Sequence, residues 1–323
     1  MFLAPEGDEV EIADAASAFL ADALPIARLH GTHAPDMDAD LRARLGAMGW
    51  FALAVPEDRG GSGLSAVEHA LFFREIGRQC GPVDVLAQAL AAKLCGSDER
   101  RAAIIAGETG VALLVGDGGV SRVLGSPEAE FGLLVTPEWA SLHTLTGMDR
   151  DERPALDLAN SLSVVGTLPE PLETSDTPDL WHIGQIGTAA MLIGMGEAAL
   201  DLIVEYAKVR ETFGRPIGTY QAVRHTCADM AVRLEAARAQ LWYAATAAKE
   251  GRADAPVHID AAKHLANETA MQCVDANIQL HGGIGVTDEH DAHLLLKHTM
   301  LLTRLFGSKR ALLKDLLHAG VED

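Results

Sequence analysis

Apolar residues recur at helical spacing over most of the first third of the chain. Three segments show this pattern, at residues 9–24, 40–49 and 65–77. In the third of them, Val67, Leu71 and Ile76 fall near one face of the expected helix. The stretch VPEDRGGSG at 55–63 combines proline, charged residues and glycine, which is typical of a loop. Residues 1–108 are therefore predicted to form an N-terminal α domain.

The pattern changes after residue 108, where short aliphatic runs replace the helical spacing. Such runs lie at 111–115, 131–135 and 162–165. Glycine and proline separate them, as in Asp117-Gly118-Gly119 and Ser126-Pro127. Residues 109–180 are therefore predicted to form a small β domain.

Residues 181–323 return to helical spacing, in four long segments. The second is the clearest, because its apolar residues are spaced 4, 3, 4, 3, 4 along one stripe: Val223, Cys227, Met230, Leu234, Ala237 and Leu241. The fourth runs from about His290 to His318 and is rich in leucine. Four helices joined by short loops predict an antiparallel C-terminal four-helix bundle. The whole fold is expected to be mainly α, with an abbreviated β domain in the middle.

Charge is distributed unevenly along the 323 residues, whose formal net charge is −20. Residues 1–180 carry 12 Lys and Arg against 29 Asp and Glu, whereas residues 181–323 carry 14 against 17. Phosphate backbones are bound by Lys and Arg, so the acidic balance excludes a general nucleic-acid binder. An anionic cofactor is easier to place in the second half of the chain.

Cysteine usage and the N-terminal residues favour a cytoplasmic protein. The four cysteines form no CxxC pair, and the start MFLAPEGDEVEIADA is acidic and lacks the pattern of a signal peptide. The richest apolar stretch, at 187–204, is interrupted by Glu197 and Asp201. We therefore expect reduced thiols and no membrane-spanning segment.

The stretch RETFGRPI at 210–217 ends the first helix of the expected bundle. Gly214 and Pro216 are sufficient to end a helix for structural reasons alone. An Arg beside such a turn can also direct its planar guanidinium at a phosphate, which makes Arg210 a candidate ligand of a phosphate group. Gln221, at the start of the next helix, either hydrogen-bonds a ligand or only contacts solvent.

The stretch QLHGGIG at 279–285 ends the third helix. Its glycines stop a helix, and they also let a flat or anionic ligand approach the backbone amides. It is not the dinucleotide fingerprint, because the spacing G-x-G-x-x-G is absent and no strand precedes it. The following DEHDAH at 288–293 has the residue types of a metal site. Spacing places no further ligand beside it, so we expect no metal.

Three blocks together resemble the acyl-CoA dehydrogenase family, the flavoproteins that desaturate acyl-CoA thioesters between the α and β carbons. The first block runs from LGAMGW at 45–50 to VPEDRGGSGL at 55–64. The second is 210–217 with Gln221 and Ala228-Asp229-Met230, and the third is 279–285. The blocks span nearly the whole chain, and the family fold of an α, a β and a four-helix α domain matches the three predicted parts.

The resemblance implies FAD as the cofactor, bound across a subunit interface. Arg210 matches the position that reaches the pyrophosphate of the FAD held mainly by the neighbouring subunit. Phe213 and Gln221 match further contacts to that FAD. Gln279, Gly282 and Gly283 match contacts to its adenylate side. The candidate cofactor-binding residues are thus Arg210, Phe213, Gln221, Gln279, Gly282 and Gly283.

The chain departs from the family in its β domain and in its catalytic base. The Thr-Glu-Pro and Trp-Ile-Thr/Ser stretches that cradle the flavin are absent. Desaturation needs a carboxylate to remove the α-proton while the β-hydride goes to flavin N5. Most members place this Glu where the present chain has Phe306, and others place it where this chain has Gly184, followed by Gln185. Neither residue can act as a base, so no catalytic residue is expected here.

This pattern resembles a subset of the family from actinobacterial steroid degradation. Those enzymes are α2β2 heterotetramers, in which one subunit holds the base and most of the flavin and the other completes the FAD site. The resemblance implies a full-length acyl-CoA dehydrogenase subunit as partner and an acyl-CoA substrate with a steroid side chain. Two alternatives stay open: a homomeric dehydrogenase with a displaced base at Asp179, Asp288 or Glu289, and a non-enzymatic scaffold of the same fold.

Overall fold

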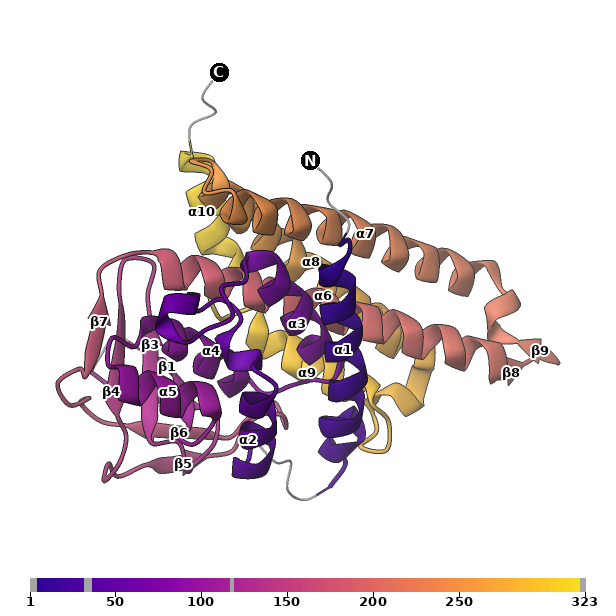
Figure 1. Cartoon of the computed structure of the whole chain (residues 1–323). Coiled ribbons are helices and arrows are strands. Elements are labelled where there is room, and N and C mark those ends of the chain that lie inside the picture. The colour runs from indigo at the N-terminus through magenta and orange to yellow at the C-terminus, as the bar shows by residue number, and fades with distance from the viewer. Residues whose placement is uncertain (1–4, 32–36, 117–118, 320–323) are drawn as a thin grey trace.

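Three parts follow one another along the chain: a helical N-terminal part, a β-sheet and a helical C-terminal part (Figure 1). The computed structural model describes residues 5–31, 37–116 and 119–319. Asp117 and Gly118, which belong to the expected glycine-rich turn, lie outside the described residues. The fold is mainly α with a β domain in the middle, as the spacing of apolar residues predicts.

The N-terminal part consists of helices joined by short 3-10 turns. The helices are α1 (Asp8–Ala23), α2 (Ala39–Ala47), α3 (Ala66–Arg78), α4 (Asp84–Leu94) and α5 (Asp98–Ala106), and the turns are η1 (Ile26–Leu29), η2 (Trp50–Ala52) and η3 (Glu57–Arg59). α3 begins with a capping box, in which Val67 N donates to Ser65 Oγ and Ser65 N donates to the Glu68 carboxylate. The three helices predicted from spacing correspond to α1, α2 and α3.

In the described part of the chain, seven strands form one sheet. They are β1 (Val111–Val115), β2 (Ser121–Leu124), β3 (Phe131–Val135), β4 (Ala140–Thr144), β5 (Asp151–Arg153), β6 (Leu162–Val165) and β7 (Glu173–Ser175). Their spatial order is β5-β6-β2-β1-β3-β4-β7, with β1 and β3 parallel and the other neighbours antiparallel. The three predicted runs are β1, β3 and β6. Leu113, Leu133 and Leu142 join the main core that also contains the N-terminal helices.

The C-terminal part is built from long helices. They are α6 (Asp179–Val209), α7 (Gln221–Lys249), α8 (Ala255–His281), α9 (Ala292–Leu302) and α10 (Lys309–His318). The hairpin β8 (Glu211–Thr212) and β9 (Arg215–Pro216) with the 3-10 turn η4 (Ile217–Thr219) follows α6, and the 3-10 turn η5 (Gly282–Val286) follows α8. The hairpin projects from the opposite side of the molecule to the sheet (Figure 1).

The prediction of one long helix from His290 to His318 is wrong, because the chain breaks between α9 and α10. Phe306 and Gly307 have positive φ angles of 52° and 116°, which a right-handed helix does not contain. Ser308 then caps the N-terminus of α10, with its Oγ accepting a hydrogen bond from Ala311 N. The leucines on both sides of the break kept the apolar pattern continuous and hid it.

Glycine brings α3 directly against α6. A Cβ added to Gly77 of α3 or to Gly194 of α6 would lie 2.0 Å from a backbone oxygen of the other helix. Beside this contact, the Glu197 carboxylate accepts hydrogen bonds from Arg74 at 2.8 Å and from Arg78 at 3.2 Å. The N-terminal helices are therefore joined to the C-terminal part by a close backbone contact and by partly buried ion pairs.

α6 is also the one helix of the described residues whose length and composition would suffice to cross a membrane. In its most apolar window, 78 % of the residues are buried inside the protein. This helix packs against α3, α7, α8 and α9. We therefore describe it as the core helix of the fold.

Candidate functional site

α6 and α8 run in the same direction, side by side, and define two ends of the C-terminal part. Near their first turns, Gln185 Nε2 donates to Asp260 Oδ1 at 2.7 Å. Near their last turns, the rings of Tyr206 and His281 lie 4.5 Å apart. A helix of the length of α6 is about 45 Å long, so the two ends are far apart. We call the first the base end and the second the hairpin end.

At the hairpin end, the chain leaves α6 through a tight hairpin whose tip is an aromatic residue. Arg210 is the C-cap residue of α6. Its carbonyl accepts a hydrogen bond from Ile217 N at 2.8 Å, which closes the hairpin. Phe213 and Gly214 form the turn with φ angles of 50° and 77°. The side chain of Phe213 is 99 % exposed. The apolar ring of Phe213 and the guanidinium of Arg210 are therefore both exposed at this end.

Two side chains of the same segment brace the hairpin. Tyr220 Oη donates to Thr212 O at 2.8 Å. The guanidinium of Arg215 lies 4.2 Å from the centre of the Tyr220 ring, within the range of a cation–π contact. The hydrogen bond and the cation–π contact hold the two short strands onto the start of α7.

The remaining candidate residues lie at the same end. Gln221 is the first residue of α7, Gln279 is in the last turn of α8, and both are exposed. Gly282 has a φ of 66°, and a Cβ added to it or to Gly283 would find nothing within 4 Å. All six candidate residues are exposed at the hairpin end. Their binding of FAD stays a prediction.

At the base end, the two positions that match the family's alternative bases touch each other. A Cβ added to Gly184 would lie 2.2 Å from Cε1 of Phe306. The Phe306 side chain is only 5 % exposed, and its ring centre is 5.5 Å from that of Trp181. The left-handed backbone at the break after α9 directs this ring towards α6. An aromatic ring therefore fills the space beside Gly184.

Lys263 and Asn267 of α8 hold the turn that carries Phe306. Lys263 Nζ donates to Asn267 Oδ1 at 2.9 Å and to Leu302 O at 3.0 Å. Asn267 Nδ2 donates to Gly307 O at 3.2 Å. Burial lowers the pKa of Lys263 to about 7. The sequence reasoning missed this pair. The signal for it is a Lys and an Asn, four residues apart, bordering the apolar stripe of the third bundle helix.

The buried Lys263 is expected to make folding stability rise with pH. The unfolded chain keeps the lysine protonated up to its ordinary pKa of 10.5, whereas the folded chain releases the proton near pH 7. Between these values the unfolded state binds more protons, so the free energy of unfolding increases with pH. Urea denaturation at several pH values measures this slope. Lys263→Met should flatten it, whereas the exposed Lys309→Met should leave it unchanged, and equal slopes in the two variants would contradict the assignment.

A carboxylate that the sequence reasoning missed also lies at the base end. Asp260 accepts the hydrogen bond from Gln185, the residue after Gly184, and burial raises the pKa of its carboxyl. Of the displaced bases considered, Asp179 is the first residue of α6 and lies at this end. The structure does not bring Asp288 or Glu289 here, because both follow η5 at the hairpin end.

The segment from Asp288 to His293 has the residue types of a metal site but not the arrangement of one. Among the described residues, no three His, Cys, Asp or Glu side chains are grouped so that they could hold a metal ion. Instead, His293 Nδ1 donates to His290 O at 2.7 Å, and Asp291 contacts His30. These side chains are engaged in contacts within the protein.

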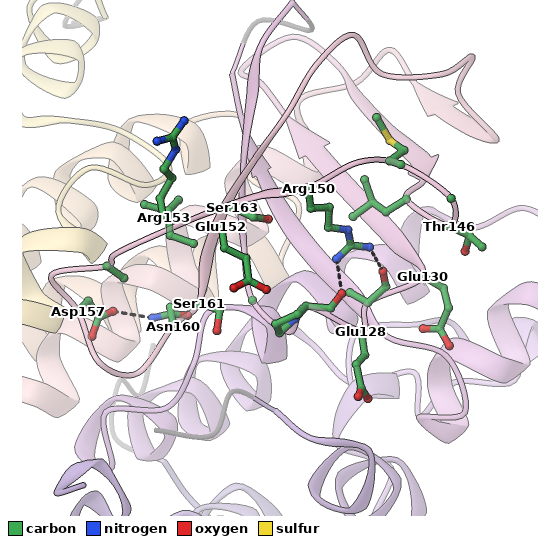
Figure 2. Close-up of a pocket in the computed structure, with 18 of the residues that line it drawn as sticks. Glu128, Glu130, Thr146, Arg150, Glu152, Arg153, Asp157, Asn160, Ser161 and Ser163 are labelled. Carbon is green, nitrogen blue, oxygen red and sulfur yellow. Dashed lines mark hydrogen bonds between the residues drawn. The ribbon is translucent and has the colours of Figure 1, made fainter. Parts of the chain in front are cut away.

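A hollow of roughly 710 Å³ lies in the β domain, between the loops around residues 125–130, 145–153 and 155–163 (Figure 2). The Arg150 guanidinium donates to Pro127 O at 2.7 Å and also to Ala129 O. Glu128 and Glu152 also line the hollow. Carboxylates line it, Arg150 is already bonded to backbone, and Arg153, which also lines it, is paired with Asp151, so the hollow is unfavourable for an anionic cofactor. None of the six candidate residues lines it.

Comparison with known proteins agrees with this architecture. Residues 6–107 match the N-terminal domain of acyl-CoA dehydrogenases, and residues 181–319 match their C-terminal domain. The acyl-CoA dehydrogenase IpdE2 of Mycobacterium tuberculosis is 33% identical over 274 residues, which cover 83% of this chain and 82% of IpdE2. FadE34, an acyl-CoA dehydrogenase of the same organism, is 34% identical over 282 residues; the match covers 79% of this chain and only 38% of FadE34.

Two solved structures share the fold at low sequence identity. The ChsE4–ChsE5 complex from Mycobacterium tuberculosis contains a chain with a TM-score of 0.83 and 20% identity, and the match covers 100% of both chains. A steroid ACAD, the Tcur3481–Tcur3483 G363A variant, matches with a TM-score of 0.78 and 22% identity over 96% of each chain. The fold is that of a flavoprotein dehydrogenase with an α, a β and an α domain. The chain belongs to the acyl-CoA dehydrogenase family.

Proposed function

We propose that this chain is the subunit of a heteromeric acyl-CoA dehydrogenase that completes the FAD site without supplying the catalytic base. The enzyme would desaturate an acyl-CoA thioester between its α and β carbons. The observation that carries the proposal is the contact between Phe306 and Gly184, which closes both base positions of the family with one aromatic ring. A proton acceptor must reach the α-proton within hydrogen-bonding distance, and a phenylalanine ring accepts no proton.

The hairpin end has the groups that one side of FAD requires. The planar guanidinium of Arg210 suits the oxygens of a pyrophosphate, with two parallel hydrogen bonds to one anion. The exposed ring of Phe213 offers an apolar face for a ligand or a neighbouring subunit. Gly282 and Gly283 leave room for a ligand to approach the backbone. When bound, FAD would accept the hydride that leaves the β carbon of the substrate.

The relatives support a partner subunit. One of the solved structures is a complex of ChsE4 with ChsE5, and the other is a steroid ACAD of Tcur3481 with Tcur3483. We extend this arrangement to the present chain, with a full-length acyl-CoA dehydrogenase subunit as partner in an α2β2 assembly and a steroid side-chain CoA thioester as substrate. The four cysteines form no disulfide, which agrees with a cytoplasmic location.

Flavin retention by the purified chain tests the proposal. The chain alone is expected to be colourless and to retain no added FAD, because only one side of the site is present. Co-expression with a full-length acyl-CoA dehydrogenase encoded beside it should give a yellow complex, seen by visible absorbance, with the mass of two copies of each chain by native mass spectrometry. A yellow homo-oligomer that an acyl-CoA bleaches would overturn the proposal.

One observation favours a second candidate function, a homomeric dehydrogenase with a displaced base. Asp260 is a partly buried carboxyl group with a raised pKa, bonded to the residue after Gly184. If the homo-oligomer were active, Asp260→Asn should abolish its turnover, while the exposed Asp275→Asn should not. A chain that binds neither FAD nor a flavoprotein partner would instead be the non-enzymatic scaffold.

A further inference from the structure

His30 joins the N-terminal helical part to the segment that follows α8. Its Nδ1 lies 2.9 Å from Asp288 O, and its Nε2 contacts the Asp291 carboxylate. These partners are 258 and 261 positions further along the chain. The side chains of His30 and Asp291 are 27% and 28% exposed. The contact is therefore a long-range link at the hairpin end, partly screened from water.

Both partners of His30 are hydrogen-bond acceptors. One is a backbone carbonyl, and the other is a carboxylate. A neutral imidazole has a single N–H and satisfies only one of them, whereas the imidazolium ion donates to both. The link is therefore complete only when the ring carries its second proton. In agreement with this geometry, the hydrogen bond to Asp291 raises the pKa of His30, while burial acts in the opposite direction.

The linked segment, residues 282–291, carries the two candidate glycines. The ring of His281, the residue just before the segment, lies 4.5 Å from the ring of Tyr206 and 4.3 Å from that of His290 near the end of the segment. The second half of the segment is held by His30. The segment otherwise follows α8 as a 3-10 turn with exposed glycines. Gly282 N donates to the last turn of α8, whereas the end of the segment that follows the glycines is held by a contact from another part of the chain.

We propose that His30 is a positioning residue for the cofactor: its doubly protonated ring fixes the 282–291 segment so that Gly282 and Gly283 face FAD, and loss of one proton loosens that segment. The inference rests on the proposed function, because it takes FAD to be the ligand of these glycines. It makes cofactor binding by the assembled enzyme dependent on pH through a residue that does not itself contact FAD.

The charged and titratable groups around His30 agree with this role. Asp288 and Asp291 face it from the linked segment and favour its charged form. The ring of His293 lies 6.5 Å away. Burial lowers the pKa of His290, Asp291 acts in the opposite direction, and the charges on His293 and His30 add to the lowering.

The end of α3 and the turn η1 contribute two further groups. Arg28 keeps its charge at neutral pH, since burial lowers its pKa only to about 10, and its guanidinium donates to Cys80 O at 2.6 Å. Burial raises the pKa of the Cys80 thiol, so this group stays neutral.

The pKa of His30 is raised in the folded chain. The contribution of His30 to the stability of the link is therefore complete below pH 6.5 and is lost as the pH rises through the raised value.

Hydrogen exchange in the full chain without FAD tests the link itself. The protection factors of amides 284–291, corrected for intrinsic exchange rates, should fall when the pH is raised from 6 to 8.5. His30→Leu should give low protection at both pH values, because leucine donates no hydrogen bond. His258→Leu serves as the matched control, since His258 lies near Asp254 at the opposite end of the bundle. Equal protection at both pH values in the parent chain would overturn the link.

FAD titration of the complex with its full-length partner tests the effect on the cofactor. The parent complex should bind FAD about fivefold more weakly at pH 8.5 than at pH 6, the factor that one ordinary hydrogen bond contributes. The His30→Leu complex should bind FAD weakly at both pH values. A protection change without any change in FAD affinity would overturn the positioning role. A complex that takes up no FAD at either pH would overturn the proposed function instead, while leaving the exchange result to decide the link.

Discussion

Alanine at position 184 is expected to lower the free energy of unfolding by about 2 kcal/mol, although alanine is normally the better helix former. The new Cβ would lie 2.2 Å from Cε1 and 2.4 Å from Cδ1 of Phe306. The backbone at Phe306 is left-handed, and Lys263 and Asn267 hydrogen-bond the turn on both sides of it. The ring therefore cannot shift to make room for the new Cβ. Urea denaturation of the purified chain measures the change. Gly166→Ala is the control, because nothing lies within 4 Å of its added Cβ.

A double-mutant cycle separates the clash from other effects of the substitution. Phe306→Ala alone should cost about 3–5 kcal/mol, because it truncates a buried ring. In that background Gly184→Ala should be neutral or stabilising by roughly 1 kcal/mol, the ordinary preference of a helix for alanine. The same loss in both backgrounds would mean that Phe306 does not fill the space beside Gly184. In the assembled enzyme, turnover per bound FAD should survive Phe306→Ala, since the base is then in the partner.

Replacing Arg210 by alanine should weaken FAD binding by the heteromeric complex about 100-fold, as expected for loss of hydrogen bonds between two charged groups. Arg210 is exposed at the hairpin end, so its removal should leave the folding of the chain unchanged. Fluorescence titration of the flavin-free complex with FAD measures the affinity. Lys208→Ala is the matched control, because Lys208 is an exposed cation on the same turn and pairs with Glu205. A similar loss of FAD affinity in the two variants would mean that Arg210 contributes only its charge and makes no specific contact with the pyrophosphate.

The secondary structure could be predicted from the sequence where the local pattern is strong. The runs at 111–115, 131–135 and 162–165 are strands with those bounds, because aliphatic residues and flanking turns specify them locally. β2, β4, β5 and β7 were not predicted; β5 and β7 have three residues each and pair at the edges of the sheet. The break at Phe306 was missed because an apolar pattern says nothing of φ, and bulky residues rarely adopt a positive φ.

The candidate site could be predicted only in part. The glycines and Arg210 stand in motifs, so their sequence positions could be read directly. The contact between Gly184 and Phe306 joins residues on different helices, and no local pattern encodes it. The same holds for His30 and Asp291, whose sequence separation is 261. Motifs therefore identify the residues that meet a ligand, whereas the supporting contacts depend on the tertiary structure.

The brace on the hairpin has a consequence for how two subunits would meet. Tyr220 and Arg215 fix the strands around Phe213 within this chain alone, so the loop reaches its shape during folding. The conformational entropy of ordering it is then lost before association, and docking needs no induced fit at this point. Recognition of the partner should accordingly resemble the meeting of two rigid bodies, limited by orientation and diffusion rather than by rearrangement of the loop.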